Sequence, residues 1–251
     1  MAALAAMSIL STRDLSKSFG GIAAVDGVDF SVKEREIRGI IGPNGAGKTT
    51  LVSLLSGRIR PDSGRIIYRG VDITGSPSWK RVRLGIAYTF QITSVYPGLT
   101  VYENAAIGAQ MRARQESASR WARVRESHVE EISRECLRLT GLESSWHKPA
   151  GELAYGHQRL LEIAIGLALD PPLLILDEPT QGLSESEIEE FIRLVGHIRV
   201  RKTIILIEHN MPLVMALADR ITVMDQGRVL AEDDPARIRQ DRRVQEAYLG
   251  E

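Results

Sequence analysis

A glycine-rich stretch near the amino terminus carries the residue types that bind phosphate. Residues 42–50 read Gly-Pro-Asn-Gly-Ala-Gly-Lys-Thr-Thr and match the phosphate-loop pattern G-x-x-x-x-G-K-[ST] at every position. Glycines let a backbone come close to phosphate, a lysine can reach the β- and γ-phosphates, and a threonine hydroxyl can ligate Mg²⁺. We therefore expect a nucleoside triphosphate to bind at Gly42, Asn44, Gly45, Ala46, Gly47, Lys48, Thr49 and Thr50, with Thr49 on the metal.

Two adjacent carboxylates follow an apolar run later in the chain. Leu173-Leu-Ile-Leu-Asp177 is typical of a central strand in a parallel sheet, so Asp177 should lie at the sheet edge where ligands bind. Asp177 would hold Mg²⁺ through water, and Glu178 would face an attacking water as general base. An acid pair at a strand end can also be structural, but the phosphate loop favours the catalytic interpretation.

The elements around the loop suit an anion site. Residues 36–41 predict a short strand, and residues 51–55 predict a helix that ends near Gly57. A strand, a glycine loop and a helix amino terminus place several backbone N–H groups around one anion.

The remaining pattern predicts an α/β protein with a helical insert. Alternation over residues 9–32 and 65–69 indicates half-buried antiparallel strands, and residues 85–90 indicate a more buried strand. Thr100-x-x-Glu103 is a capping box that should begin a helical region reaching residue 142. After this region, the expected helices cover residues 158–169, 185–199 and 211–218, and the expected strands cover 173–177, 203–207 and 221–224.

The composition excludes some classes of protein. The 251 residues hold 32 Lys and Arg and 32 Asp and Glu, and this zero net charge argues against a nucleic-acid partner. The single cysteine, Cys136, cannot form an internal disulfide and fits a reducing compartment. In residues 112–138 a group of arginines is followed at once by glutamates, and Trp121 is the only aromatic residue nearby, so a solvated helix is favoured over a phosphate or RNA patch.

No apolar run is long enough to span a membrane, and residues 1–7 are too short and lack the basic start of a signal peptide. We expect a cytosolic protein that can dock on a membrane protein, with Met1 or Met7 as the start.

Four further sequence motifs point to a protein family. Gln91 ends a strand, Leu153-Ala-Tyr-Gly-His-Gln158 precedes a helix, Thr180-Gln-Gly-Leu-Ser184 follows Asp-Glu-Pro, and Glu208-His209 follows an apolar strand. In this order the chain resembles the ATP-binding cassette (ABC) ATPases over essentially its whole length. The resemblance implies a single domain over residues 7–251, with a RecA-like core (7–91 and 170–251) and an inserted α-helical subdomain (about 92–169). The core would have a mixed sheet with antiparallel N-terminal strands.

The resemblance also implies a role for each matching position. Phe19 would stack on adenine, and His209 would contact the γ-phosphate. Gln91 would sense Mg²⁺ and the attacking water and link to a transmembrane partner. Ser184 lies in the D-loop. The signature would contact the γ-phosphate bound by the opposite subunit; it consists of Leu153, Ala154, Tyr155, Gly156 and His157.

Each position has a plainer interpretation when taken alone. Phe19 can be a core aromatic, His209 a hydrogen-bonded structural histidine, and Gln91 carries no information by itself. Three residues depart from the general ABC pattern: Ala154 replaces the signature serine, His157 its glutamine, and Ser184 the D-loop acid. Ser184-x-x-Glu187 also fits a capping box for the next helix.

The resemblance can be narrowed to one branch. Thr89-Phe-Gln91, Leu-Ala-Tyr-Gly, Leu206-Ile-Glu-His-Asn-Met211 and Ala247-Tyr-Leu-Gly-Glu251 are similar to LivG-type ATPases of branched-chain amino acid importers. This branch implies ATP and Mg²⁺ as cofactors and a head-to-tail dimer with a paralogous ATPase or a second copy. It also implies transmembrane permeases as partners, a periplasmic solute-binding protein as an indirect partner, and a cytoplasmic location on the inner face of the membrane.

Other functions stay open at this point. The chain could serve an export or lipid-extraction system, or an importer of urea, amides or aromatic acids. A soluble ABC protein acting on ribosomes or DNA usually has two cassettes or a long coiled coil, and this chain shows neither.

Overall fold

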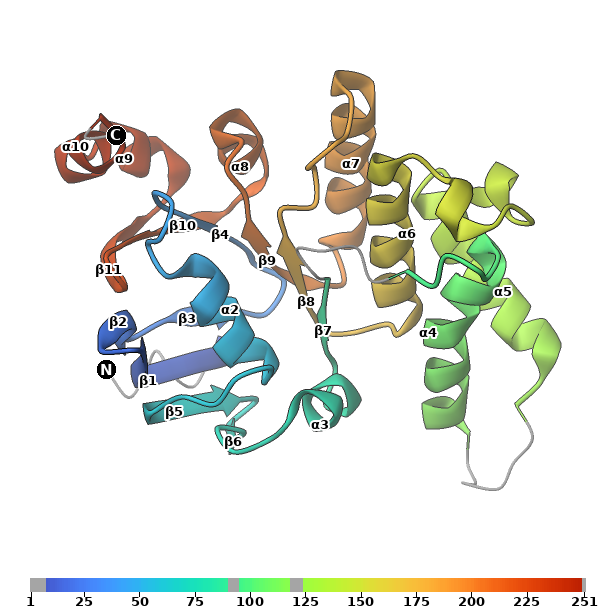
Figure 1. Cartoon of the computed structure of the whole chain (residues 1–251), viewed down its shortest axis with the longest axis horizontal. Helices are drawn as coiled ribbons and strands as arrows, with labels where there is room; N and C mark the ends of the chain where they lie inside the picture. Colours follow the sequence, from blue (N-terminus) through green and yellow to red (C-terminus); the bar gives the residue numbers. More distant parts are fainter. Residues whose placement is uncertain (1–7, 90–94, 118–123, 250–251) are drawn as a thin grey trace. The chain divides into compact units, whose positions relative to one another are not determined.

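The computed structural model describes residues 8–89, 95–117 and 124–249, which form two compact units (Figure 1). The described part of the first unit comprises residues 8–86, 172–177 and 198–249. The second comprises 87–89, 95–117, 124–171 and 178–197. The second unit therefore contains residues 178–197 in addition to the central helical region.

The first unit begins with an antiparallel sheet. Its strand order is β2-β1-β5-β6, with β3 paired to β1. The inward side chains are the alternating apolar residues of the sequence, and Leu10, Leu15 and Val32 are fully buried. The strands are β1 (Ser8–Phe19), β2 (Ile22–Val28), β3 (Ser31–Lys33), β5 (Ser63–Tyr68) and β6 (Val71–Asp72).

A second sheet in the order β11-β10-β4-β9-β8-β7 carries the phosphate loop. Strands β10, β4, β9 and β8 run parallel, and every residue of β4, β9 and β8 is buried, as expected for a sheet covered on both faces. Strand β11 is antiparallel to β10. The strands are β4 (Ile37–Ile41), β7 (Ile86–Tyr88), β8 (Leu173–Asp177), β9 (Thr203–Ile207), β10 (Arg220–Asp225) and β11 (Arg228–Asp233).

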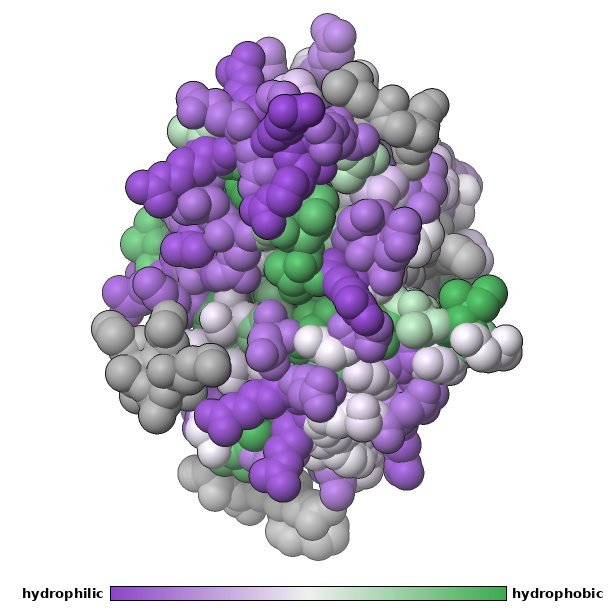
Figure 2. Space-filling model, turned by 90° about the vertical axis from the view of Figure 1, so that its left-hand side faces the viewer, coloured by the Kyte–Doolittle hydropathy of each residue, from purple (hydrophilic) through white to green (hydrophobic). Residues whose placement is uncertain are grey.

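The helices of the first unit are short. They are α2 (Lys48–Ser56), α3 (Ser78–Arg83), α8 (Met211–Leu217), α9 (Pro235–Gln240) and α10 (Arg242–Leu249). Buried Arg81 of α3 donates to the carbonyls of Leu54 and Leu55, so it caps the carboxyl end of α2. On the face that carries α9 and α10, most side chains are hydrophilic, and they surround a smaller hydrophobic area near the middle of the view (Figure 2).

Four helices form most of the second unit: α4 (Val101–Glu116), α5 (Glu126–Leu139), α6 (Tyr155–Ala168) and α7 (Glu185–Ile198), the last residue of which lies in the first unit. Two single turns, η1 (Glu143–Ser145) and η2 (Ala150–Glu152), lead into α6. Helices α4, α5 and α6 pack against one another. A Cβ at Gly108 of α4 would lie 2.4 Å from the carbonyl oxygen of Ile165, so this glycine permits close packing against α6.

Most of the predicted elements are confirmed, with two differences. The Thr100–Glu103 capping box is formed, and the arginines and glutamates of α4 and α5 make surface ion pairs, as in a solvated helix. The helix predicted from Gln158 begins at Tyr155 instead, because three residues of the signature form its first turn. Strands β6 and β11 and helices α3, α9 and α10 were not expected. None of the helices in the described ranges is both long and apolar enough to cross a bilayer.

Candidate nucleotide site

The phosphate loop joins the end of β4 to the start of α2, and its glycines are set by close approach. Gly42 and Gly47 have φ of 151° and 97°. A Cβ on either would lie 2.1 Å from a backbone oxygen, that of Met224 or of Ala24 respectively. At Gly45, with φ of 80°, a Cβ would meet nothing within 4 Å. Gly42 and Gly47 therefore let the loop pack against the backbone of Met224 and Ala24, whereas Gly45 borders open space.

Lys48 lies inside the loop at the first position of α2. Its Nζ donates to the carbonyl oxygens of Gly42 at 2.6 Å and Pro43 at 2.9 Å, and the residue is buried. The ammonium thus lies at the positive end of the helix dipole, where anions are favoured. Asn44 and Thr49 are exposed, so their polar groups are open to a ligand.

Two segments far away in the sequence support the loop. Gly227, in the turn between β10 and β11, donates its N–H to the carbonyl of Ala46 at 3.1 Å. The carbonyl of Gly227 in turn accepts from the N–H of Asp26 at 2.9 Å. Arg228 and Asp26 also form an ion pair at 2.7 Å. No motif in the sequence marks these residues, so sequence reasoning missed them.

Phe19 ends β1 at the tip of a hairpin. It pairs with Ile22 across the turn and is 50% exposed, so it is not a core aromatic. The Lys17 ammonium lies 5.4 Å from the centre of its ring. Strand β2 runs from this tip to Val28 and includes Ala24, whose carbonyl lies beside Gly47. The β1–β2 hairpin therefore links an exposed aromatic ring to the phosphate loop.

The carboxyl ends of β8 and β9 carry the predicted acid and histidine. Asp177 is buried and pairs in register with Ile207, so Glu208 and His209 follow at the same edge of the sheet. His209 is exposed, and its N–H donates to the carboxylate of buried Glu208 at 3.2 Å. The structure therefore brings Asp177 and His209 to the sheet edge at which β4 leads into the phosphate loop.

Glu178 follows Asp177 and begins the second segment of the other unit. Its side chain is half-buried, and its φ of 50° lies in the left-handed region, which is uncommon for a residue other than glycine. Such backbone strain is concentrated at functional sites in proteins.

The signature lies in the second unit, at the amino terminus of α6. Ala154 is the N-cap and makes no side-chain hydrogen bond, while Leu153 accepts a bond from the Gln158 amide at 3.0 Å. Tyr155 is 46% exposed. A Cβ at Gly156 would lie 2.8 Å from the carbonyl oxygen of Gly182, so the first turn of α6 packs directly on the D-loop.

His157 and Ser184 contact the same side chain, Glu187. One Glu187 oxygen lies 3.1 Å from His157 Nε2, and the other accepts from the N–H and hydroxyl of Ser184, both at 2.7 Å. The hydrogen bonds from Ser184 hold the pKa of Glu187 below its usual value, and His157 adds to the effect. The Ser184–Glu187 capping box is thereby confirmed. Its link to His157 was missed, because no spacing rule connects two distant segments.

The donor set fits a magnesium ion bound together with phosphate. Thr49 and Asp177 supply oxygen atoms, which Mg²⁺ prefers, and α2 packs against β8. Among the described residues there is no group of three or more His, Cys, Asp or Glu that could hold a metal alone. Gln91, the third predicted metal-associated residue, lies outside the described residues.

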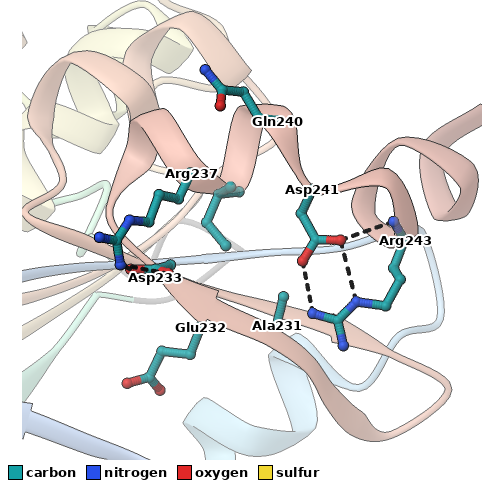
Figure 3. Close-up of a pocket in the computed structure, with 8 residues that line it drawn as sticks. Ala231, Glu232, Asp233, Arg237, Gln240, Asp241 and Arg243 are labelled. Atoms are coloured by element: carbon teal, nitrogen blue, oxygen red, sulfur yellow. Dashed lines mark hydrogen bonds and ion pairs between the residues drawn. The ribbon is translucent and has the colours of Figure 1, made fainter.

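A cavity elsewhere in the first unit lacks these features. It has a volume of about 280 Å³ and is lined by residues of β11, α9 and the start of α10 (Figure 3). Its arginines are paired with its own acids, Arg243 with Asp241 at 2.7 Å and Arg237 with Asp233 at 3.4 Å. The charges are therefore internally neutralised, and we assign no ligand to it.

Comparison with known proteins agrees with this geometry. The family model described as ABC transporter matches residues 25–181, and one described as branched-chain amino acid ATP-binding cassette transporter matches residues 228–251. The latter segment contains β11, α9 and α10.

Similar proteins cover nearly the whole chain. The high-affinity branched-chain amino acid transport ATP-binding proteins LivG of Salmonella typhimurium and BraF of Pseudomonas aeruginosa are each 38% identical over 97% of this chain and 98% of their own. The crystal structure of the ADP conformation of MJ1267, an ATP-binding cassette of an ABC transporter, has a TM-score of 0.85 at 32% identity. It covers 98% of this chain and 100% of its own. By its fold, its phosphate loop and these matches, the chain belongs to the ATP-binding cassette family of transporter ATPases.

Proposed function

We propose that this chain is the ATP-binding and ATP-hydrolysing subunit of an importer for branched-chain or other hydrophobic amino acids. The observation that carries the nucleotide part is the Lys48 ammonium inside a glycine loop, at a helix amino terminus and at the sheet edge of Asp177. The solute class is supported by the names of LivG and BraF and by the match of the carboxyl-terminal segment.

In this proposal the loop exchanges internal hydrogen bonds for bonds to ATP. Lys48 turns from the carbonyls of Gly42 and Pro43 to the β- and γ-phosphates, and the N–H groups of residues 45–50 surround the same anion. Phe19 stacks on adenine. Thr49 and Asp177, with Gln91, would hold Mg²⁺, which neutralises charge on the phosphates when bound.

Hydrolysis needs a base and a γ-phosphate contact. Glu178 accepts a proton from water as the water oxygen bonds to the γ-phosphorus. The bond to the β–γ bridging oxygen breaks, leaving ADP and phosphate. His209, exposed at the same sheet edge as Asp177, contacts the γ-phosphate and helps to orient the water.

One chain carries one phosphate loop, in the first unit, and one signature, in the second. We propose that two chains pair head to tail, so that each signature (Leu153–His157) faces the nucleotide of the other chain. The partner is a paralogous ATPase or a second copy, bound to permeases on the inner face of the membrane and served by a periplasmic solute-binding protein. The RecA-like core (7–91 and 170–251) and the helical subdomain (92–169) of the family are the domain division we propose for this chain.

Replacing Glu178 by Gln tests the proposal, because it preserves shape and removes the base. We expect near-normal ATP binding by calorimetry, turnover below about a tenth of wild type, and an ATP-stabilised dimer detected by light scattering. Lys48→Ala is the matched variant and should lose ATP binding itself. A Glu178→Gln protein that hydrolyses ATP at the wild-type rate would refute the catalytic assignment.

The solute is tested by uptake. Cells that depend on this transporter should accumulate labelled leucine or isoleucine, and Glu178→Gln should abolish that uptake. Uptake of urea, an amide or an aromatic acid instead would overturn the solute assignment and leave the ATPase assignment intact.

A further inference from the structure

Glu187 lies between the two segments of the second unit that depart from the family pattern. It is the third residue of α7 and belongs to the same compact unit as α6. One of its carboxylate oxygens accepts from the N–H and hydroxyl of Ser184, and the other lies 3.1 Å from Nε2 of His157. A single carboxylate thus joins the start of α7 to the first turn of α6.

The backbone on both sides of this contact is closely packed. Cβ atoms at Gly156 and Gly182 would lie 2.8 Å from the Gly182 carbonyl oxygen and 2.7 Å from a Tyr155 ring carbon respectively. The Tyr155 hydroxyl lies 3.5 Å from the amide oxygen of Gln181. The segment from Gln181 to Glu187 therefore lies along the first turn of α6 in both backbone and side-chain contacts.

The residues at positions 157 and 184 are matched to this carboxylate. Ser184 offers a hydroxyl donor, and His157 offers a ring N–H when it is protonated or in the corresponding tautomer. An aspartate at position 184 would instead place a second carboxylate next to Glu187, and like charges so close repel. The two departures thus form one hydrogen-bonded group with Glu187.

We propose that Glu187 is a positioning residue for ATP hydrolysis, which holds the signature turn at His157 and the D-loop turn at Ser184 in a fixed relation. The proposal rests on the function proposed above. The signature turn is the part of α6 that would face the γ-phosphate of the other chain, and Ser184 lies six residues after Glu178, the proposed base. Glu187 thus joins the signature turn to the segment that follows the base.

The test uses Glu187→Gln in the purified transporter assembled around this chain, with Glu185→Gln as the matched control. Glu185 lies on the same turn of α7, is exposed, and undergoes the same change of charge. Glutamine can still accept at a capping box, so α7 should keep its start and the unfolding temperature should stay close to that of the control.

We expect Glu187→Gln to lower kcat about threefold to tenfold, because a charge-assisted hydrogen bond is roughly twice as strong as a neutral one. The KM for ATP should stay unchanged, because the contacts of Glu187 are to Ser184 and His157, which are not phosphate-loop residues. If Glu187 had a purely structural role, the substitution would lower the unfolding temperature and would not lower kcat selectively at an unchanged KM.

A double-mutant cycle with His157→Ala and Glu187→Ala completes the test. If the two residues act through one contact, the double variant should lose no more turnover than the worse single variant. Multiplied losses, or equal turnover in Glu187→Gln and Glu185→Gln, would overturn the inference. A wild-type assembly without ATP turnover would overturn the proposed function as well, so the two failures are distinguishable.

Discussion

Replacing buried Arg81 by Met should destabilise the phosphate-loop unit more than any change on its surface. The guanidinium of Arg81 is 1% exposed and makes five hydrogen bonds of 2.6–3.1 Å, all to backbone carbonyls. Two of these carbonyls end α2, the helix that begins at Lys48. The others belong to residues 73, 74 and 76. The side chain therefore joins the end of that helix to the segment before α3.

The size of the effect follows from two opposed terms. Burial lowers the pKa of Arg81 to about 10, which corresponds to a desolvation cost of about 3 kcal/mol at about 1.4 kcal/mol per pKa unit. Hydrogen bonds from a charged donor contribute about 1.5 kcal/mol each at the lower end of their range, so five of them outweigh that cost by about 4 kcal/mol. Methionine would recover the desolvation cost and leave five buried carbonyls without this donor.

We expect Arg81→Met to lower the free energy of unfolding by about 4 kcal/mol and the unfolding temperature by about 10 °C. Arg81→Lys should lose about half as much, because an ammonium has three donors and no planar fork. Arg83→Met, at an exposed position of the same helix, is the control. Calorimetry and urea titration measure the difference. A loss below about 1 kcal/mol, or one equal to that of Arg83→Met, would refute the reasoning.

Three further outcomes are expected. Gly47→Ala should abolish ATP binding by calorimetry, because its Cβ would lie 2.1 Å from the Ala24 oxygen, whereas Gly196→Ala, where a Cβ meets nothing within 4 Å, should leave binding unchanged. Ala154→Ser should raise the free energy of unfolding by about 1 kcal/mol, because serine can cap α6, and should change turnover less than tenfold; a larger rise would mean that Ala154 limits the rate. Hydrogen bonds from Thr100 lower the pKa of Glu103 from 4.5. The ionised Glu103 carboxylate therefore stabilises the folded state fully above pH 4.5, and this stabilisation is lost as the pH falls through the lower pKa of the folded state. Thermal unfolding of Glu103→Gln should accordingly depend less on pH between about 5 and 3 than that of wild type.

The parts of the fold that depend on local signals could be predicted from sequence. The glycine loop, the Thr100 capping box and the apolar runs of β4, β8 and β9 each have a pattern confined to a few residues, and all are present. The start of α6 was placed three residues too late, because the signature has no side-chain cap at Ala154 that could mark the boundary.

The missed features depend on contacts between distant segments. The bond from Gly227 to the phosphate loop and the five bonds of Arg81 involve backbone carbonyls, which no residue type reveals. The contact of His157 with Glu187 joins residues 30 positions apart, and the sequence showed only the local part of this group, the capping box at Ser184. The roles assigned to Phe19, Glu178 and His209 stay predictions.

Asp177 and Glu178 are one peptide bond apart, yet they belong to different compact units. Asp177 ends the regular backbone of β8, whereas Glu178 has a φ of 50° in the left-handed region. Two neighbouring carboxylates therefore stand on different backbones, one relaxed and one strained. A set of substitutions at position 178 would report the tolerance of that backbone together with the chemistry of the side chain, and glycine is the replacement that relieves the strain.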